Sequence, residues 1–401
     1  MTGPGKRAVE RLDLLGGISD EPGRLTRTFL SPASCIAGEQ VMAWMRELGM
    51  AVDRARDGTL RGILPGPNSD APPLLLGSHL DTVIDAGRFD GALGIVAALA
   101  ALESIDGPLH FPVHVLAFSD EEGVRFHTTY LGSRSISGPL DARTLAIRDS
   151  SGVSIAEALE NEGFTGSADI HYEPRSIRGY VEVHIEQGRV LEEAGEPVAV
   201  VTAIAGQSRL SLTFTGRTDH AGTTPMTLRR DALAGAAECV LHAESLARAN
   251  PPLVATVGML HPTPGVSNSI PGSATLSLDF RHPESVAHRT LLAQLHDTCT
   301  QVAQRRGLTL DWSVIQENGP VPCHAILTRQ LATAAVAETG SCREMISGAG
   351  HDGVAVSTVG PIAMLFVRCR DGLSHHPDEF ASPEDIDTAV RVLARFLKSL
   401  A

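Results

Sequence analysis

The chain has 401 residues, of which 43% are hydrophobic and 20% charged, which is typical of a soluble globular protein with more than one domain. Its net charge of −14 argues against a surface for nucleic acid or for an anionic membrane, but does not exclude a small anionic substrate. No apolar run approaches the roughly 20 residues of a membrane-spanning helix, and the first residues lack the features of a secretory signal, so we expect a cytoplasmic protein. The six cysteines form no C-x-x-C pair, which favours reduced thiols.

The first seventy residues predict helical and then irregular structure, with helical apolar spacing over residues 38–50. Beyond them, short apolar stretches alternate with helical ones, and a helix of small residues is predicted over 91–105. Continuously apolar strands are typical of a sheet covered on both faces. This alternation predicts an α/β fold with a central, mostly parallel sheet, whose strands fall at 73–78, 113–120, 179–188 and within 361–376.

The middle of the chain has a different pattern. Residues 209–219 and 273–282 alternate between apolar and polar side chains, as strands with one solvated face do. Glycine and proline interrupt the chain near residues 206 and 320. We therefore predict an α+β domain, residues 208–320, inserted into a discontinuous domain formed by 1–207 and 321–401, with two further helices near 229–248 and 284–306 and a strand at 309–316.

Each of the four apolar strands ends in polar residues, most of them of types that can bind a metal ion. Ligands of open α/β sheets bind at the carboxyl ends of the strands, so these side chains are expected to lie together. One further carboxylate, Asp90, precedes the helix that follows the first strand. The strand-end residues are His79 and Asp81, Glu121 and Glu122, His184 and Gln187, and the pair His375 and His376.

Adjacent carboxylates such as Glu121 and Glu122 repel each other unless a cation compensates them, and imidazole with carboxylate suits zinc, manganese, cobalt or nickel. A single catalytic zinc usually takes three protein ligands, so five candidates favour two divalent ions bridged by Asp90. Glu121 is then the candidate general base, and Asp81 a candidate to orient the imidazole of His79.

Several motifs resemble the M20-type metallohydrolases, and within them the hydantoinase/carbamoylase branch. That branch contains N-carbamoyl-L-amino-acid hydrolases, β-ureidopropionases, allantoate amidohydrolases and ureidoglycolate amidohydrolases. The resemblance covers nearly the whole chain, and His184 stands where peptidase members generally place a carboxylate. The motifs are GSHLDTV (77–83), GRFDGALG (87–94), SDEEGVRF (119–126), HIEQG (184–188), DHAGTTPM (219–226), SNSIPG (267–272), SGAGHD (347–352) and GLSHHPDE (372–379).

The resemblance implies that His79 and His184 hold one metal ion, Glu122 and His375 hold the other, and Asp90 bridges the two. It supports Glu121 as the general base. The family usually has another small polar residue where this chain has His376, and His375 is preferred because the family ligand directly follows the serine.

The resemblance also implies roles in the inserted domain, which serves the family as a lid and for homodimerisation. His220 would stabilise the oxyanion, Asn268 and Arg281 would bind the substrate carboxylate, and Gln187 and His351 would contact substrate. Simpler roles stay open: a turn cap for His220, a structural ion pair for Arg281, and support of the metal ligands for His351.

The expected reaction is hydrolysis of the ureido C–N bond of a small anionic substrate. Residues 18–32 and 365–379 look closest to allantoate amidohydrolases, with an N-carbamoyl-L-amino-acid hydrolase or a β-ureidopropionase as the alternative. A dipeptidase or aminoacylase of the wider superfamily, and a non-catalytic ureide-binding relative, are the remaining hypotheses.

Overall fold

The computed structural model describes residues 3–68, 70–163 and 169–400. These residues form two compact units. Unit 1 consists of Met1–Thr202 and Cys323–Ala401, and unit 2 of Ala203–Pro322. Among the described residues, no helix has both the length and the apolar character needed to span a membrane.

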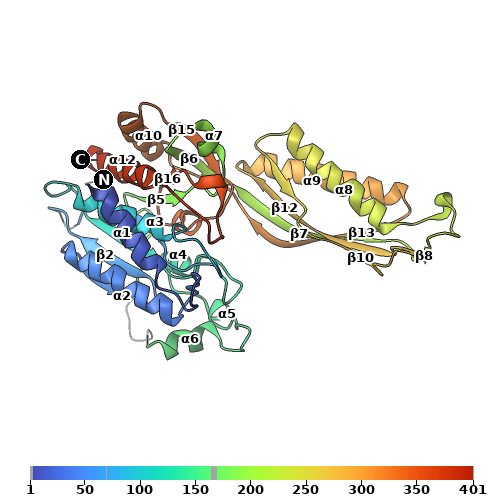
Figure 1. The fold of residues 1–401 in the computed structure, drawn as a ribbon, viewed down its shortest axis with the longest axis horizontal. Coiled ribbons are helices and arrows are strands. Elements are labelled where there is room, and N and C mark those ends of the chain that lie inside the picture. The colour runs from blue at the N-terminus through green and yellow to red at the C-terminus, as the bar shows by residue number, and fades with distance from the viewer. Residues whose placement is uncertain (1–2, 69, 164–168, 401) are drawn as a thin grey trace. The chain divides into compact units, whose positions relative to one another are not determined.

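Unit 1 is built around a mixed sheet of nine strands (Figure 1). Its four central strands, in the order β4-β3-β5-β16, are parallel to one another. The strands are β1 (Ala51–Arg54), β2 (Leu60–Leu64), β3 (Leu74–His79), β4 (Val113–Phe118), β5 (Gly179–Ile185), β6 (Val198–Ile204), β14 (Val321–Pro322), β15 (Arg343–Ser347) and β16 (Ile362–Val367).

The prediction of a mostly parallel sheet is correct for these four central strands and wrong for the flanks. On one flank β2 pairs antiparallel with β4, and β1 with β2; on the other, β6 pairs antiparallel with β16, and β14 with β6. The pattern of β6 is nearly as apolar as that of β16, with Thr202 as its one polar residue, and such a pattern carries no information about strand direction. The irregular structure predicted before residue 70 also contains β1 and β2.

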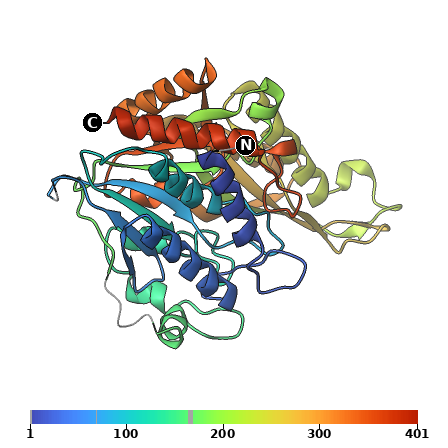
Figure 2. The same cartoon turned by 60° about the vertical axis from the view of Figure 1, so that its left-hand side comes forward.

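Four helices of unit 1 pack on one another in a layer, seen in Figures 1 and 2: α1 (Pro4–Gly16), α3 (Ala92–Glu103), α10 (Ala325–Thr339) and α12 (Pro383–Ser399). Eleven of the twelve residues of α3 are buried, and most are alanine, glycine or leucine, which lets the helix approach β3 and β5 closely. The other helices of this unit are α2 (Pro32–Glu47), α4 (Leu131–Ser135), α5 (Ala142–Leu145), α6 (Ile155–Asn161), α7 (Val190–Ala194) and α11 (Gly353–Val356).

Unit 2 has its own sheet and its own hydrophobic core. Strand β12 (Ser273–His282) pairs antiparallel with β7 (Gly206–Thr215), and β7 with β13 (Thr309–Asn318); β9 (Val254–Thr256) and β10 (Leu260–Thr263) pair with β12. Helices α8 (Ala232–Ala249) and α9 (Ser285–Arg305) pack on this sheet. Side chains alternate between buried and half-buried along β12, which matches the alternation in the sequence.

Candidate metal centre

The four parallel strands carry the candidate ligands to one edge of the sheet. His79 is the last residue of β3, Glu122 follows β4, His184 lies near the end of β5, and His375 lies in the loop after β16. Because the carboxyl ends of parallel strands meet at the same edge, residues almost three hundred positions apart in the sequence come together.

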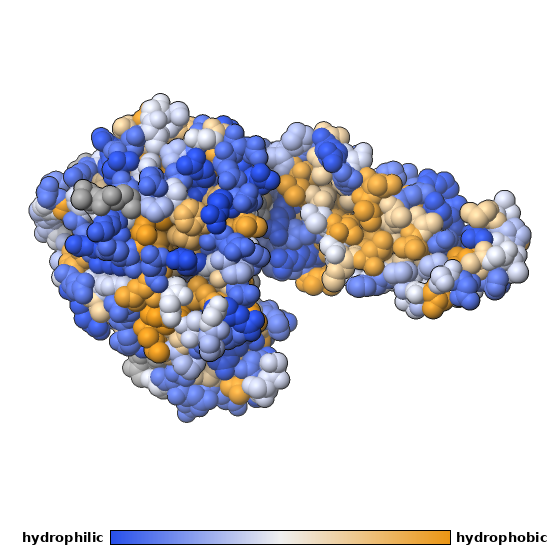
Figure 3. All heavy atoms as spheres, viewed as in Figure 1, coloured by the Kyte–Doolittle hydropathy of each residue, from blue (hydrophilic) through white to orange (hydrophobic). Residues whose placement is uncertain are grey.

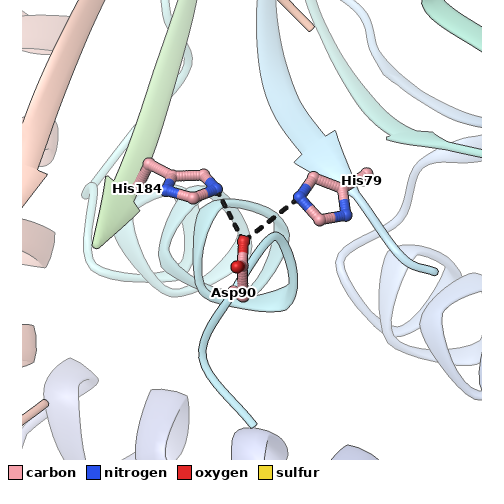
Figure 4. Close-up of side chains that lie close together, drawn as sticks. All are labelled: His79, Asp90 and His184. Atoms are coloured by element: carbon pink, nitrogen blue, oxygen red, sulfur yellow. Dashed lines mark ion pairs between the residues drawn. The ribbon is translucent and has the colours of Figure 1, made fainter. Parts of the chain in front are cut away.

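Three imidazoles converge on one buried carboxylate, that of Asp90. Nε2 of His184 lies 3.0 Å and Nε2 of His79 lies 3.4 Å from its Oδ1 (Figure 4). Nε2 of His375 lies 3.2 Å from Oδ2. The side chains of His79, His184 and Asp90 are at most 5% exposed, whereas that of His375 is 49% exposed. The centre is therefore open to solvent on the side of His375.

The other ring nitrogens show which atoms of the two buried imidazoles can bind a cation. Nδ1 of His79 lies 3.0 Å from the backbone oxygen of Asp81, and Nδ1 of His184 lies 3.0 Å from that of Ile185. A carbonyl only accepts, so each Nδ1 carries the proton, and in the neutral ring Nε2 presents a lone pair. Two lone pairs then face the Asp90 carboxylate. A cation between them removes this repulsion, so the donor set fits a divalent ion.

Two sets of possible ligands share Asp90. One set is His79, Asp90 and His184; the other is Asp90, Glu122 and His375, and within each set the ligand atoms lie within 4.8 Å of one another. Nε2 of His375 is also 3.3 Å from Oε1 of Glu122. The five residues grouped from the sequence lie together in these two sets, and a third possible set combines His79 with Glu121 and Glu122.

The close packing of the His79 ring against the backbone requires a glycine at position 91. Gly91 has a φ of 66°, and a Cβ at this position would lie 2.4 Å from the ring of His79. A side chain here would therefore be strained and would collide with the imidazole.

The charges at the centre are unbalanced. Burial alone would raise the pKa of Asp90, but the three imidazoles, if protonated, would lower it well below its usual value through hydrogen bonds. Burial raises the pKa of Glu121 well above its usual value, although a protonated His79 would act in the opposite direction. Burial likewise raises the pKa values of Asp120 and Asp352, whose carboxylate oxygens have no hydrogen-bond partner among the described residues. Bound cations would compensate this excess of buried carboxylate.

Asp81 holds the loop that carries the two glutamates. Its Oδ1 accepts a hydrogen bond from the backbone N–H of Glu121 at 2.9 Å, and its Oδ2 accepts one from that of Glu122 at 3.1 Å. The backbone oxygen of Asp81, rather than its carboxylate, lies closer to Nδ1 of His79, at 3.0 Å against 3.5 Å. The side chain thus acts mainly on the glutamates, which the sequence did not reveal.

The two adjacent histidines point to different partners. His375 contacts Asp90 and Glu122, whereas Nδ1 of His376 accepts a hydrogen bond from the backbone N–H of Asp378 at 3.1 Å. His376 belongs to none of the ligand groups found among the described residues. This geometry favours His375 as the candidate ligand.

Gln187 and His351 differ in their access to the centre. Nε2 of Gln187 donates to Oδ2 of Asp90 at 3.0 Å, while its buried Oε1 has no partner among the described residues and is free to accept a hydrogen bond. His351 is 1% exposed, its ring packs edge-on against His184 at 4.5 Å, and its Nε2 lies 2.7 Å from Oγ of Ser347. His351 therefore supports His184 in this structure.

Three predicted site residues lie in unit 2. His220, in β8 (Asp219–His220), pairs with Ser269 of β11 (Ser269–Ile270), and its Nδ1 accepts hydrogen bonds from the backbone N–H groups of Gly222 and Thr223. Asn268, just before β11, is exposed like His220. The guanidinium of Arg281 forms a forked contact with Asp279, with distances of 2.6 and 2.9 Å. The structure thus gives His220 a turn-capping contact and Arg281 an ion pair.

Sequence reasoning missed two carboxylates near the centre, Glu182 and Glu379, which are 0% and 3% exposed. Glu182 forms a further possible ligand group with His184 and His351. It lies two residues before His184 on the same strand, and this spacing places both on one face, which was a usable signal. Glu379 ends the last of the recognised motifs, but its position in the sequence gives no indication of its partners.

Comparisons with known proteins agree with this geometry. The model of the peptidase family M20/M25/M40 matches residues 75–399. Allantoate deiminase 2 of Glycine max is 40% identical over 98% of this chain and 89% of its own length, and the N-carbamoyl-L-amino acid amidohydrolase of Geobacillus stearothermophilus is 38% identical over 99% and 98%. A solved amidase of the hydantoinase/carbamoylase family from Burkholderia multivorans is 33% identical, covers 98% of this chain and 97% of its own, and has a TM-score of 0.94. The family resemblance inferred from the motifs is confirmed: the chain belongs to the peptidase family M20/M25/M40.

Proposed function

We propose that this protein is a di-metal amidohydrolase that cleaves the ureido C–N bond of a small carboxylate substrate, with allantoate as the first candidate. The observation that carries the proposal is the pair of ligand sets that share Asp90, with a carboxylate oxygen of Glu121 within 4.8 Å of ligand atoms of His79 and Glu122. The similarity to an allantoate deiminase and to an N-carbamoyl-L-amino acid amidohydrolase over nearly the whole chain supports the reaction class.

The donor set fits two divalent ions, for which zinc and manganese are the first candidates and cobalt and nickel are alternatives. His79 and His184 would hold one ion, Glu122 and His375 the other, and Asp90 would contribute to both. When bound, such a pair acidifies a water and polarises the carbonyl group of the substrate.

Glu121 is the proposed general base. No described residue donates a hydrogen bond to its carboxylate, and Asp81 fixes its backbone, so the side chain is positioned but its oxygens remain available. It takes a proton from the attacking water and returns a proton to the leaving nitrogen. As the C–N bond of the carbamoyl carbon breaks, ammonia leaves, and the resulting carbamate decomposes to carbon dioxide and a second amine.

Gln187 is proposed to bind the ureido group. Its Nε2 is already used by Asp90 and by Ser374, at 3.0 and 3.1 Å, which leaves the buried Oε1 as an acceptor for a substrate N–H. A ureido group carries N–H donors on both of its nitrogens, whereas a peptide bond carries a single N–H. An N-carbamoyl-L-amino acid satisfies the same acceptor, and it is the second candidate substrate.

We further propose that unit 2 is a lid and dimerisation domain, and that His220, Asn268 and Arg281 complete the substrate site. His220 and Asn268 are exposed, which leaves them accessible to a ligand. Arg281 would have to share its fork between Asp279 and the substrate carboxylate. Unit 2 also exposes large apolar side chains on the face seen in Figure 3 and elsewhere, which supports a homodimer; they include Leu241, Met259, Val286 and Ile315. A cytoplasmic location stays a prediction from the sequence.

A substrate panel tests the proposal. The protein is treated with a chelator and then reloaded with Mn²⁺ or Zn²⁺. Ammonia release is measured with allantoate, several N-carbamoyl-L-amino acids and 3-ureidopropionate, and release of free amino acids is measured with dipeptides. We expect turnover of ureido compounds only after metal is restored. Faster cleavage of dipeptides than of any ureido compound, or no turnover of either with metal, contradicts the proposal.

A further inference from the structure

Glu379 is a buried carboxylate that the proposed reaction does not use. It is 3% exposed and lies four residues after His375 in the sequence. Among the described residues it forms no ion pair with a lysine, an arginine or a histidine. Burying a carboxylate without a cation is costly unless hydrogen-bond donors replace the lost water, so the donors around Glu379 indicate its role.

Those donors belong to two loops that are far apart in the sequence. Oε1 of Glu379 accepts hydrogen bonds from the backbone N–H groups of Phe89, at 2.9 Å, and Asp90, at 3.0 Å. Oε2 lies 3.2 Å from the hydroxyl of Ser374, and the same hydroxyl lies 2.9 Å from Oδ2 of Asp90. One side chain thus ties the main chain of Asp90 to the residue that precedes His375.

The close approach of Glu379 to the first loop requires a glycine. A Cβ built on Gly87 would lie 2.3 Å from Cβ of Glu379 and 2.4 Å from its Oε1. Contacts this short do not occur, so any side chain at position 87 would displace the carboxylate or the loop.

The second loop needs support because His375 has a φ of 55°. A non-glycine residue keeps this left-handed conformation only where its surroundings hold it. The hydroxyl of Ser374, which lies within hydrogen-bond distance of both Asp90 and Glu379, supplies such a constraint immediately before His375.

We propose that Glu379 is a positioning residue that sets the relative placement of Asp90 and His375, and thereby the affinity of the centre for divalent ions. The inference rests on the proposed function, because it takes both side chains to be metal ligands. Glu379 itself touches neither substrate nor metal. Residues that orient metal ligands in this way typically change metal affinity or activity by about 10- to 100-fold when removed.

The test compares Glu379→Ala, Glu379→Gln and Gly87→Ala in the full chain, with Mn²⁺ affinity measured by equilibrium dialysis and folding checked by circular dichroism. We expect Glu379→Ala to weaken Mn²⁺ binding by about 10- to 100-fold. Glu379→Gln should retain most of the affinity, because its amide oxygen still accepts from both backbone N–H groups and its amino group can donate to Ser374. Gly87→Ala should weaken binding as Glu379→Ala does.

Asp57 provides a matched control. It is 5% exposed, and its carboxylate also accepts hydrogen bonds from a backbone N–H, that of Thr59, and from a serine hydroxyl, that of Ser135. Asp57→Ala should lower the melting temperature and leave Mn²⁺ affinity unchanged, since a purely structural carboxylate has no reason to affect the ligands.

Unchanged Mn²⁺ affinity in folded Glu379→Ala would overturn the proposal, as would an equal loss in Glu379→Gln. Should Glu379→Ala not fold, Gly87→Ala decides, and wild-type affinity in that variant refutes the proposal. Failure of the proposed function is distinguishable, because it would show as wild-type protein that binds no divalent ion or hydrolyses no ureido compound.

Discussion

The loop that carries Glu121 and Glu122 offers a sharp test through Asp81. In Asp81→Asn one side-chain oxygen can still accept an N–H, but the new amino group faces the other N–H, so one bond is lost and a buried donor is left unpaired. A hydrogen bond to a charged group is worth about 1.5–3 kcal/mol, and an unpaired buried donor costs about 1–3 kcal/mol. The combined cost is therefore about 2.5–6 kcal/mol.

If this cost raises the free energy of the transition state, kcat decreases by roughly 100- to 10,000-fold, because about 1.36 kcal/mol corresponds to a factor of ten. The assay is ammonia release from the best ureido substrate at saturating Mn²⁺, with bound metal measured in parallel. Asp57→Asn, which alters a similarly buried carboxylate that belongs to none of the possible ligand sets among the described residues, should change stability but leave kcat within about threefold. A kcat of Asp81→Asn within threefold of wild type would refute the reasoning.

Three further predictions concern single groups. Glu121→Gln should abolish turnover and leave metal content near that of the wild type, because it removes the proposed base and no proposed ligand; retained activity would exclude Glu121 from that role. His375→Ala should reduce the metal content, measured by elemental analysis, whereas His376→Ala should leave it unchanged, and the reverse result would assign the ligand to His376. Burial, and then the charge of Arg61, lowers the pKa of His114 to about 4. The unfolded chain binds this proton near pH 6.5 and the folded chain only near pH 4, so the free energy of unfolding should fall by up to about 3 kcal/mol as the pH drops between these values. Urea titrations of His114→Gln should lack this part of the decrease, and an identical pH dependence would contradict the assignment.

The sequence was sufficient to predict the centre of the fold because the pattern there is strong. The four apolar strands and the small-residue helix α3 lie within a few residues of their predicted positions, and β12 matches its predicted range, 273–282. The flanks could not be predicted, because the direction of a strand depends on which neighbour it pairs with. Strand β6 is apolar except for Thr202, but it runs antiparallel to β16, and only the path of the chain after β5 determines this.

The candidate ligands could be proposed from the sequence because both signals that were used, the ends of strands and the motifs, identify residues by their side chains. The contacts that orient these side chains were less accessible, because many of them involve the backbone. The imidazole of His79 is held by a carbonyl oxygen, and Asp81 and Glu379 act on backbone N–H groups. Every residue has such groups, so a sequence does not distinguish the ones that are used.

This difference also explains why the structure was needed to distinguish the surroundings of the two adjacent histidines. His375 and His376 are chemically identical, and the sequence separates them only by resemblance. In the structure, the left-handed backbone of His375 turns its ring toward Asp90 and Glu122, while His376 accepts a backbone hydrogen bond within its own loop. That backbone conformation is uncommon outside glycine, and the hydroxyl of Ser374, which lies between Asp90 and Glu379, constrains the residue before it. In the proposed site, Ser374 and Glu379 would therefore determine which histidine serves as the ligand, while their own side chains would bind no metal.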